Sequence, residues 1–119
     1  VTLIEFKRPE RDDYTLEDNP INQIITYVKN LRDAKQKSKD GETINISNNT
    51  PIYAYIIASI TPKLKEIAED TGYLTISSDA LGYFGFHPKH HIYFEIISYK
   101  KMIQDAKDRN KILFDKLNI

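Results

Sequence analysis

The chain has 119 residues, of which 40% are hydrophobic and 29% charged, a composition typical of one globular domain with a modest core. Its 17 basic and 17 acidic side chains cancel, so overall charge gives nucleic-acid binding no support, and such a role would need a local basic patch. The absence of cysteine excludes disulfides and thiolate metal sites. Because it contains no apolar run of bilayer length and no signal-peptide pattern, we expect a cytoplasmic protein without a membrane partner.

The first segment, residues 1–7 (VTLIEFK), is predicted to be a β-strand. Side chains alternate between the faces of a strand, so Glu5 and Lys7 share one face, and we expect Ile4 and Phe6 to point into a helix-packed interior. Because Glu5 and Lys7 are two residues apart, their carboxylate and ammonium groups start roughly 6.5 Å from each other along the backbone, at the carboxyl end of the strand. Two interpretations remain open: a functional pair, or a solvated strand end with a weak surface ion pair. Because the chain starts with Val1 inside this strand, we expect it to be a piece of a longer polypeptide.

A charged, aperiodic loop is predicted over residues 8–18, and a helix over residues 20–35. Asn19 followed by Pro20 is a helix-start signal, because asparagine caps the first turn and proline suits the first helical position. Apolar residues follow at helical spacing on one face, namely Ile21, Ile24, Ile25, Val28 and Leu31. A short strand is expected over residues 43–46.

The nearly continuous apolar run over residues 52–58 is typical of a strand buried on both faces of a parallel sheet. Because a helix separates it from residues 3–7, we expect these two strands to be parallel. A second helix is predicted to start at Thr61-Pro62, with Thr61 as its cap and proline at the first helical position, and to stop at Gly72.

Short strands are predicted over residues 73–76 and 82–86, and a longer one over residues 92–97 that pairs with the second of them through the turn His87-Pro88-Lys89. Ser98 is expected to cap a last helix over residues 99–117. The apolar stripe of that helix, which we expect to pack inward on the sheet, comprises Tyr99, Met102, Ile103, Ala106, Leu113, Phe114 and Leu117. Asn110 falls on this stripe, and we expect it to be buried and hydrogen-bonded to backbone.

Together these elements predict a single α/β domain over residues 1–119. Its mixed sheet would have residues 3–7 and 52–58 as central parallel strands, with flanking helices and an antiparallel edge hairpin.

Gln23 and Tyr27 are neighbours on the first helix because residues four apart stack along one side. They fall on the flank of the apolar stripe, and the helix can place that flank over the carboxyl end of the first strand, where open α/β sheets bind ligands. Polar residues at a helix rim are usually only solvated, so QxxxY alone is a weak signal. Joined to a preceding strand that ends in E-x-K, it becomes a stronger one.

This pair of motifs resembles the PD-(D/E)xK nuclease superfamily, particularly its RecB-like branch, in which an E-x-K strand precedes a QxxxY helix. Longer strings resemble the C-terminal region of bacterial proteins that also carry a histidine-kinase-like (GHKL) ATPase domain. These strings are EFKRPERDDYTLEDNPINQIITYV, TPIYAYII, GYFGF and ISYKKMIQDAKDRNKILFDKL, and they cover most of the chain. The resemblance implies a restriction-endonuclease-like core, the C-terminal part of a longer chain, with DNA and the ATPase domain of the parent protein as partners.

The resemblance also implies roles for individual residues. Glu5 and the carbonyl of Phe6 would ligate a divalent cation, expected to be Mg²⁺. Lys7 would orient or help to deprotonate the attacking water and stabilise charge in the transition state. Gln23 and Tyr27 would position the DNA backbone or the water.

One member of the pattern is missing, because the superfamily carries an earlier acidic residue on the strand before E-x-K. Three explanations remain open: a segment upstream of Val1 supplies this ligand, Asp12 or Asp13 replaces it, or the domain is inert. We therefore expect the chain as printed not to cleave DNA. The resemblance implies either a metal-dependent nuclease or an inert nuclease-fold module that serves in nucleic-acid binding, sensing or docking.

Two further groups of side chains could bind a ligand. Arg8 and Arg11 would contact DNA phosphates beside the proposed metal, or belong to a solvated charged loop. His87, His90 and His91 lack the further ligands that tetrahedral zinc needs, so we expect exposed imidazoles at a hairpin turn.

Overall fold

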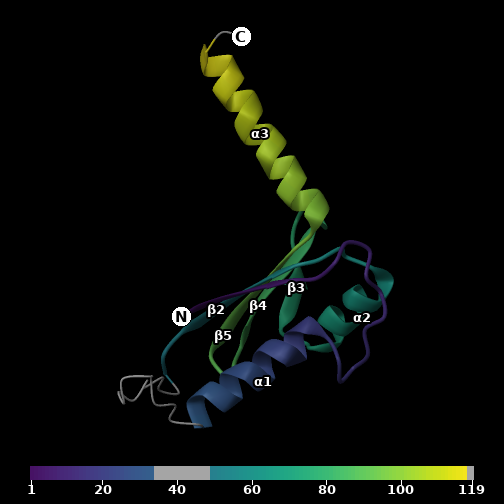
Figure 1. Cartoon of the computed structure of the whole chain (residues 1–119), viewed down its shortest axis with the longest axis vertical. Helices are drawn as coiled ribbons and strands as arrows, with labels where there is room; N and C mark the ends of the chain where they lie inside the picture. Colours follow the sequence, from purple (N-terminus) through teal and green to yellow (C-terminus); the bar gives the residue numbers. More distant parts are fainter. Residues whose placement is uncertain (34–48, 118–119) are drawn as a thin grey trace.

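The computed structural model describes residues 1–33 and 49–117 and has an α/β fold (Figure 1). In chain order the elements are β1 (Thr2–Phe6), α1 (Pro20–Asp33), β2 (Ile52–Ile57), α2 (Pro62–Asp70), β3 (Leu74–Ile76), β4 (Gly82–His87), β5 (Ile92–Ile97) and α3 (Tyr99–Leu117). The predicted elements are confirmed within two residues at the ends that can be compared. The strand expected over residues 43–46 and the predicted end of the first helix at residue 35 lie outside the described residues.

The strands form one mixed sheet in the order β1-β2-β5-β4-β3. The predicted parallel pairing of β1 with β2 is confirmed, with Glu5 opposite Ile56, and β2 is also parallel to β5. The predicted antiparallel pairing of β4 with β5 is confirmed, but this hairpin does not lie at the edge as expected, because β3 pairs antiparallel with β4 and forms the far edge. Since β1, β2 and β5 run in the same direction, their carboxyl ends meet at one edge of the sheet, called the carboxyl edge below.

One face of the sheet carries the core, and α1 and α2 cover it. Val28 of α1 and Leu64 of α2 are fully buried, as are Ile56 and Phe94 on the covered face of the sheet. Thr61 caps α2 as predicted, because its Oγ1 accepts a hydrogen bond from the N–H of Leu64 at 3.4 Å. This core fixes the position of α1 beside the end of β1.

Two expectations about β1 were wrong. The strand lies at an edge of the sheet, not at its centre. The side chains of Ile4 and Phe6 do not point into the core, because these residues are 59% and 64% exposed. Glu5 and Lys7 lie instead on the face that α1 covers. Strand alternation shows which residues share a face, but it does not show which face a helix will cover.

The last helix was predicted with the right bounds and the wrong packing. Ser98 caps it as expected, since its Oγ accepts the N–H of Lys101 at 2.9 Å. However, α3 extends away from the end of β5 (Figure 1), and none of its residues is buried. Beyond the half-buried Tyr99, its apolar stripe does not pack on the sheet: Phe114 is half exposed, and Asn110 is exposed.

Candidate functional site

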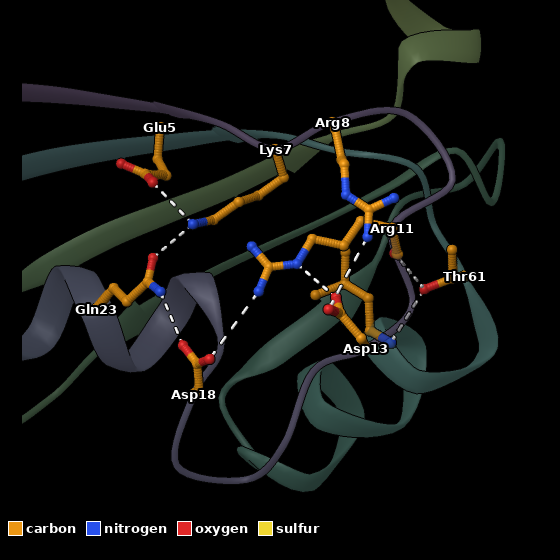
Figure 2. Close-up of polar contacts among 9 residues, drawn as sticks. Glu5, Lys7, Arg8, Arg11, Asp13, Asp18, Gln23 and Thr61 are labelled. Atoms are coloured by element: carbon orange, nitrogen blue, oxygen red, sulfur yellow. Dashed lines mark hydrogen bonds and ion pairs between the residues drawn. The ribbon is translucent and has the colours of Figure 1, made fainter.

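The side chain of Lys7 lies at the carboxyl edge and is only 10% exposed. Its Nζ is 2.9 Å from Glu5 Oε1 and donates a hydrogen bond to Gln23 Oε1 at 2.6 Å (Figure 2). A lysine side chain with so little exposure is costly unless acceptors contact its ammonium group. The strand residue Glu5 and the helix residue Gln23 supply two such acceptors, so three of the four residues that the motifs singled out do meet.

The start of α1 holds Gln23 in place. Asn19 is 2% exposed, and its Oδ1 accepts the N–H of Asn22 at 2.9 Å, as the predicted cap requires. The Asn19 amide also donates to the carbonyls of Thr15 and Leu16, and the Asn19 carbonyl accepts the N–H of Gln23 at 3.0 Å. Hydrogen bonds therefore join the first turn of α1 to the loop before it and also connect residues within the turn.

Asp18 orients the Gln23 amide, a role that the motifs did not indicate. Gln23 Nε2 donates to Asp18 Oδ1 at 3.0 Å, which turns the amide oxygen towards Lys7 (Figure 2). Arg11 Nη2 lies 4.0 Å from the other Asp18 oxygen. Glu5, Lys7, Gln23 and Asp18 thus form one chain of polar contacts, called the Lys7 network below. The sequence did show that Asp18 directly precedes the capping residue Asn19. Many helices start in this way, so the position alone does not indicate a contact with Gln23.

Tyr27 lies one helical turn beyond Gln23 and is 53% exposed. Together with Glu5 and Ile24 it lines a cavity of about 210 Å³. The fourth motif residue therefore shares a hollow with Glu5, and there is open space beside this carboxylate, whose side chain is 39% exposed.

The two arginines differ in their surroundings. Arg11 Nε donates to Asp13 Oδ1 at 2.6 Å, and its guanidinium lies 4.8 Å from the centre of the Tyr14 ring. The hydrogen bond from Arg11 lowers the pKa of the Asp13 carboxyl. The side chain of Arg8 is 69% exposed, with Nη2 at 3.9 Å from Asp13. Arg8 is therefore the more accessible of the two to a phosphate, and phosphate binding by either stays a prediction.

The backbone carbonyl of Phe6 faces the outer edge of β1. Lys7 donates its N–H to the Ile57 carbonyl at 2.9 Å, and Tyr53 donates to the Val1 carbonyl at 2.8 Å. In a parallel pair, alternate residues bond to the neighbouring strand, so the odd-numbered residues of β1 bond to β2. The Phe6 carbonyl, between two such residues, points the other way, where the described part of the chain places no strand.

The oxygen atoms at the end of β1 provide only part of the ligands that Mg²⁺ needs. Glu5 offers a carboxylate and Phe6 a carbonyl, and Mg²⁺ is commonly held by one or two carboxylates with waters and phosphates completing its shell. Within residues 1–33 and 49–117, no three histidine or acidic side chains gather in a group that could hold a metal ion. Asp12 accepts the N–H of Lys63 at 3.0 Å and Asp13 is bound to Arg11, so the structure does not favour either as the replacement ligand.

The histidines form part of the β4–β5 turn. All three are half-buried, not exposed as expected. His87 Nδ1 accepts the N–H groups of Lys89 and His90, both at 3.2 Å, and the rings of His87 and His90 are 4.8 Å apart. Burial lowers the pKa of both imidazoles. These contacts give His87 a structural role in the turn.

No family model, curated protein or solved structure matches this chain. In the described part of the chain, no helix has both the length and the apolar character needed to span a bilayer. The case for a function therefore rests on the geometry of the Lys7 network and on the motifs that it contains.

Proposed function

We propose that this chain belongs to a metal-dependent, restriction-endonuclease-like domain that acts on DNA phosphodiesters. The observation that carries the proposal is the ammonium of Lys7, whose side chain is 10% exposed, held between Glu5 and Gln23 at the carboxyl edge. A structural ion pair has no need of an exposed carboxylate beside a cavity, whereas a hydrolytic site needs both a cation ligand and room for substrate. Glu5 provides the first, and the hollow that it shares with Tyr27 provides the second.

The residues of the site have distinct roles in this proposal. Glu5 and the Phe6 carbonyl hold Mg²⁺, which would act as a Lewis acid on the phosphoryl oxygens. A lysine ammonium has three N–H groups, and the two contacts to Glu5 and Gln23 leave one to donate to the attacking water or to a phosphoryl oxygen. Asp18, through Gln23, keeps Lys7 in position.

Substrate contacts complete the proposed site. Arg8 binds a DNA phosphate from the loop after β1, and Tyr27 contacts the backbone from the rim of α1. The second acidic ligand that the superfamily pattern implies is assigned to the longer parent protein, because Asp12 and Asp13 are bound elsewhere.

The test uses the full-length parent protein with single- and double-stranded DNA, with Mg²⁺ or with EDTA. Cutting is expected only with Mg²⁺, and Glu5→Gln and Lys7→Met should each reduce the rate at least about 100-fold, because charge stabilisation at a reacting phosphate is of that order. Lys63→Met is the matched control, since Lys63 is a half-buried lysine paired with Glu66 on α2. Undiminished cutting by the Glu5 or Lys7 variant would refute the assignment.

A second candidate function is an inert nuclease-fold module that binds nucleic acid or docks on the ATPase domain of its parent. The lack of a three-residue metal cluster among the described residues favours it. It predicts that the full-length protein binds DNA, or that this domain binds the ATPase portion, with no Mg²⁺-dependent cutting under any of the conditions above.

A further inference from the structure

A second cavity, of about 360 Å³, lies at the carboxyl edge, where β2 and β5 end and α2 and α3 begin. Its walls come from the segments that follow these two strands and from the β3–β4 region. None of its lining residues belongs to the Lys7 network. It is therefore a hollow separate from the proposed nuclease site.

The cavity is lined by two lysines and by no acidic side chain. Lys65 reaches it from α2 and Lys100 from α3, and both residues are exposed. Among the described residues neither lysine forms an ion pair, whereas the adjacent Lys101 is paired with Asp79 at 2.5 Å and Asp105 at 3.4 Å. Two cations without counter-charges at one opening attract an anion.

Two serine hydroxyls add hydrogen-bond donors to the lining. Ser98, 4% exposed, accepts the N–H of Lys101 at 2.9 Å, and Ser59 accepts the N–H of Glu10 at 2.8 Å. Each hydroxyl therefore serves as an acceptor for protein and still has its hydrogen to donate. Donor hydroxyls beside two lysines are the groups that bind phosphate oxygens.

The rest of the wall is apolar. Ile76 is 42% exposed although it lies on the covered face of the sheet, and it borders the cavity together with Leu81. Tyr83, 1% exposed, lies at the inner side, and its hydroxyl contacts Glu69 at 3.2 Å. Burial, reinforced by Glu69, raises the pKa of Tyr83 to about 12, so at neutral pH this phenol carries no charge that would repel an anion.

We propose that this cavity binds a small organic phosphate with a flat apolar body, the chemistry of a mononucleotide. Lys65, Lys100 and the two hydroxyls hold the phosphate, and the apolar wall at Ile76 and Leu81 holds the body. Tyr99 also lines the cavity, and its hydroxyl donates to the Lys7 carbonyl at 2.5 Å, so an occupant would contact a residue that is bound to the end of β1.

The test is a titration of the ¹⁵N-labelled chain with adenosine 5′-monophosphate, followed by amide chemical shifts. Saturable shifts are expected at the amides of residues 76–82 and 98–101. Adenosine and inorganic phosphate, each lacking one half of the ligand, should bind at least roughly tenfold more weakly, because losing a charge-assisted contact or the apolar contact has about that effect.

Lysine variants identify the site. Lys65→Gln and Lys100→Gln should each weaken binding roughly tenfold, whereas Lys107→Gln, an exposed α3 lysine away from the cavity, should not change it. Glu5→Gln should bind like the wild type, which separates this site from the proposed nuclease site. Absence of shifts at millimolar monophosphate, equal binding of adenosine, or unchanged affinity in both lysine variants would overturn the proposal.

Discussion

At the scale of single residues, His87 shows how a ring nitrogen makes a turn depend on pH. Its Nδ1 accepts two backbone N–H groups, which only a neutral imidazole can do. Burial, followed by the nearby His90, lowers its pKa below the ordinary value of 6.5. The unfolded chain therefore takes up the proton first as pH falls, and the folded state loses stability below about pH 6.5 and not above it.

We predict that replacing His87 by asparagine reduces this pH dependence. Asparagine keeps an acceptor oxygen for the turn but does not titrate. Between pH 7 and pH 5.5 the Tm of the wild type should fall by roughly 2–4 °C more than that of His87→Asn, as expected for a small loss of stability in a chain of this size. His90 is present in both proteins, so the difference reports the titration of His87 together with its interaction with His90. Equal decreases in the Tm of the two proteins across this pH range would contradict the prediction.

The candidate site was partly predictable from its residues. Glu5 and Lys7 were found because strand alternation puts them on one face, and Gln23 and Tyr27 because helical spacing puts them on one flank. Asp18 was missed because its role comes from its contact with the Gln23 amide, and neither periodicity nor spacing reports such a contact. Tyr99 was missed for the same reason, since it reaches Lys7 from 92 residues away.

At the scale of elements, the edge strand β3 depends on a close approach to β4 at Gly85. Gly85 lies opposite Leu74, and a Cβ atom at this glycine would overlap the backbone carbonyl of Tyr73. Since a backbone atom cannot rotate away as a side chain can, β3 would have to move.

We predict that Gly85→Ala lowers the free energy of unfolding by about 2–3 kcal/mol, the upper part of the range for overpacked positions. Urea unfolding measures the loss, and amide exchange at residues 74–76 should show that β3 is the part released. The control is Gly72→Ala, where nothing lies within 4 Å of the added carbon but φ is +77°. That strain should cost only about 1 kcal/mol. A Gly85 variant no less stable than the Gly72 variant would show that β3 can be displaced at little cost.

Helix starts were the most predictable elements because a cap is a local signal. The capping residues Asn19, Thr61 and Ser98 all make the expected hydrogen bonds within three residues of themselves. The orientation of β1 was not predictable in this way. Its pattern allowed either face to be buried, and the position of α1 decides between them through contacts far apart in the sequence.

At the scale of the whole molecule, strand order was the least accessible feature. The parallel pairing of β1 with β2 follows from the helix between them, and this was predicted. That β5 lies beside β2, which leaves β1 at the edge, was not predicted, because the turn that indicates the β4–β5 hairpin does not show which other strand the hairpin joins. The face of the sheet that α1 and α2 leave uncovered carries exposed apolar side chains, because Ile4, Phe6 and Phe86 are each more than half exposed.

The helix α3 provides the sharpest test of the arrangement of the whole molecule. It spans 19 residues, none of them buried, although Leu113 and Phe114 lie on an apolar stripe. A hydrophobic side chain stabilises the fold only through the area that it removes from water. We therefore predict that Phe114→Ala changes the free energy of unfolding by less than about 0.5 kcal/mol, the range for exposed positions.

Phe94→Ala is the matched comparison, because Phe94 is fully buried in the core and its truncation should cost about 3–5 kcal/mol. Both values come from urea unfolding of the printed chain at several protein concentrations. If Phe114→Ala were as costly as Phe94→Ala at every concentration, α3 would have to fold back on its own sheet in solution. If the cost rose with concentration, the stripe would be buried between copies of the chain. A small cost that does not depend on concentration is what the extended helix requires.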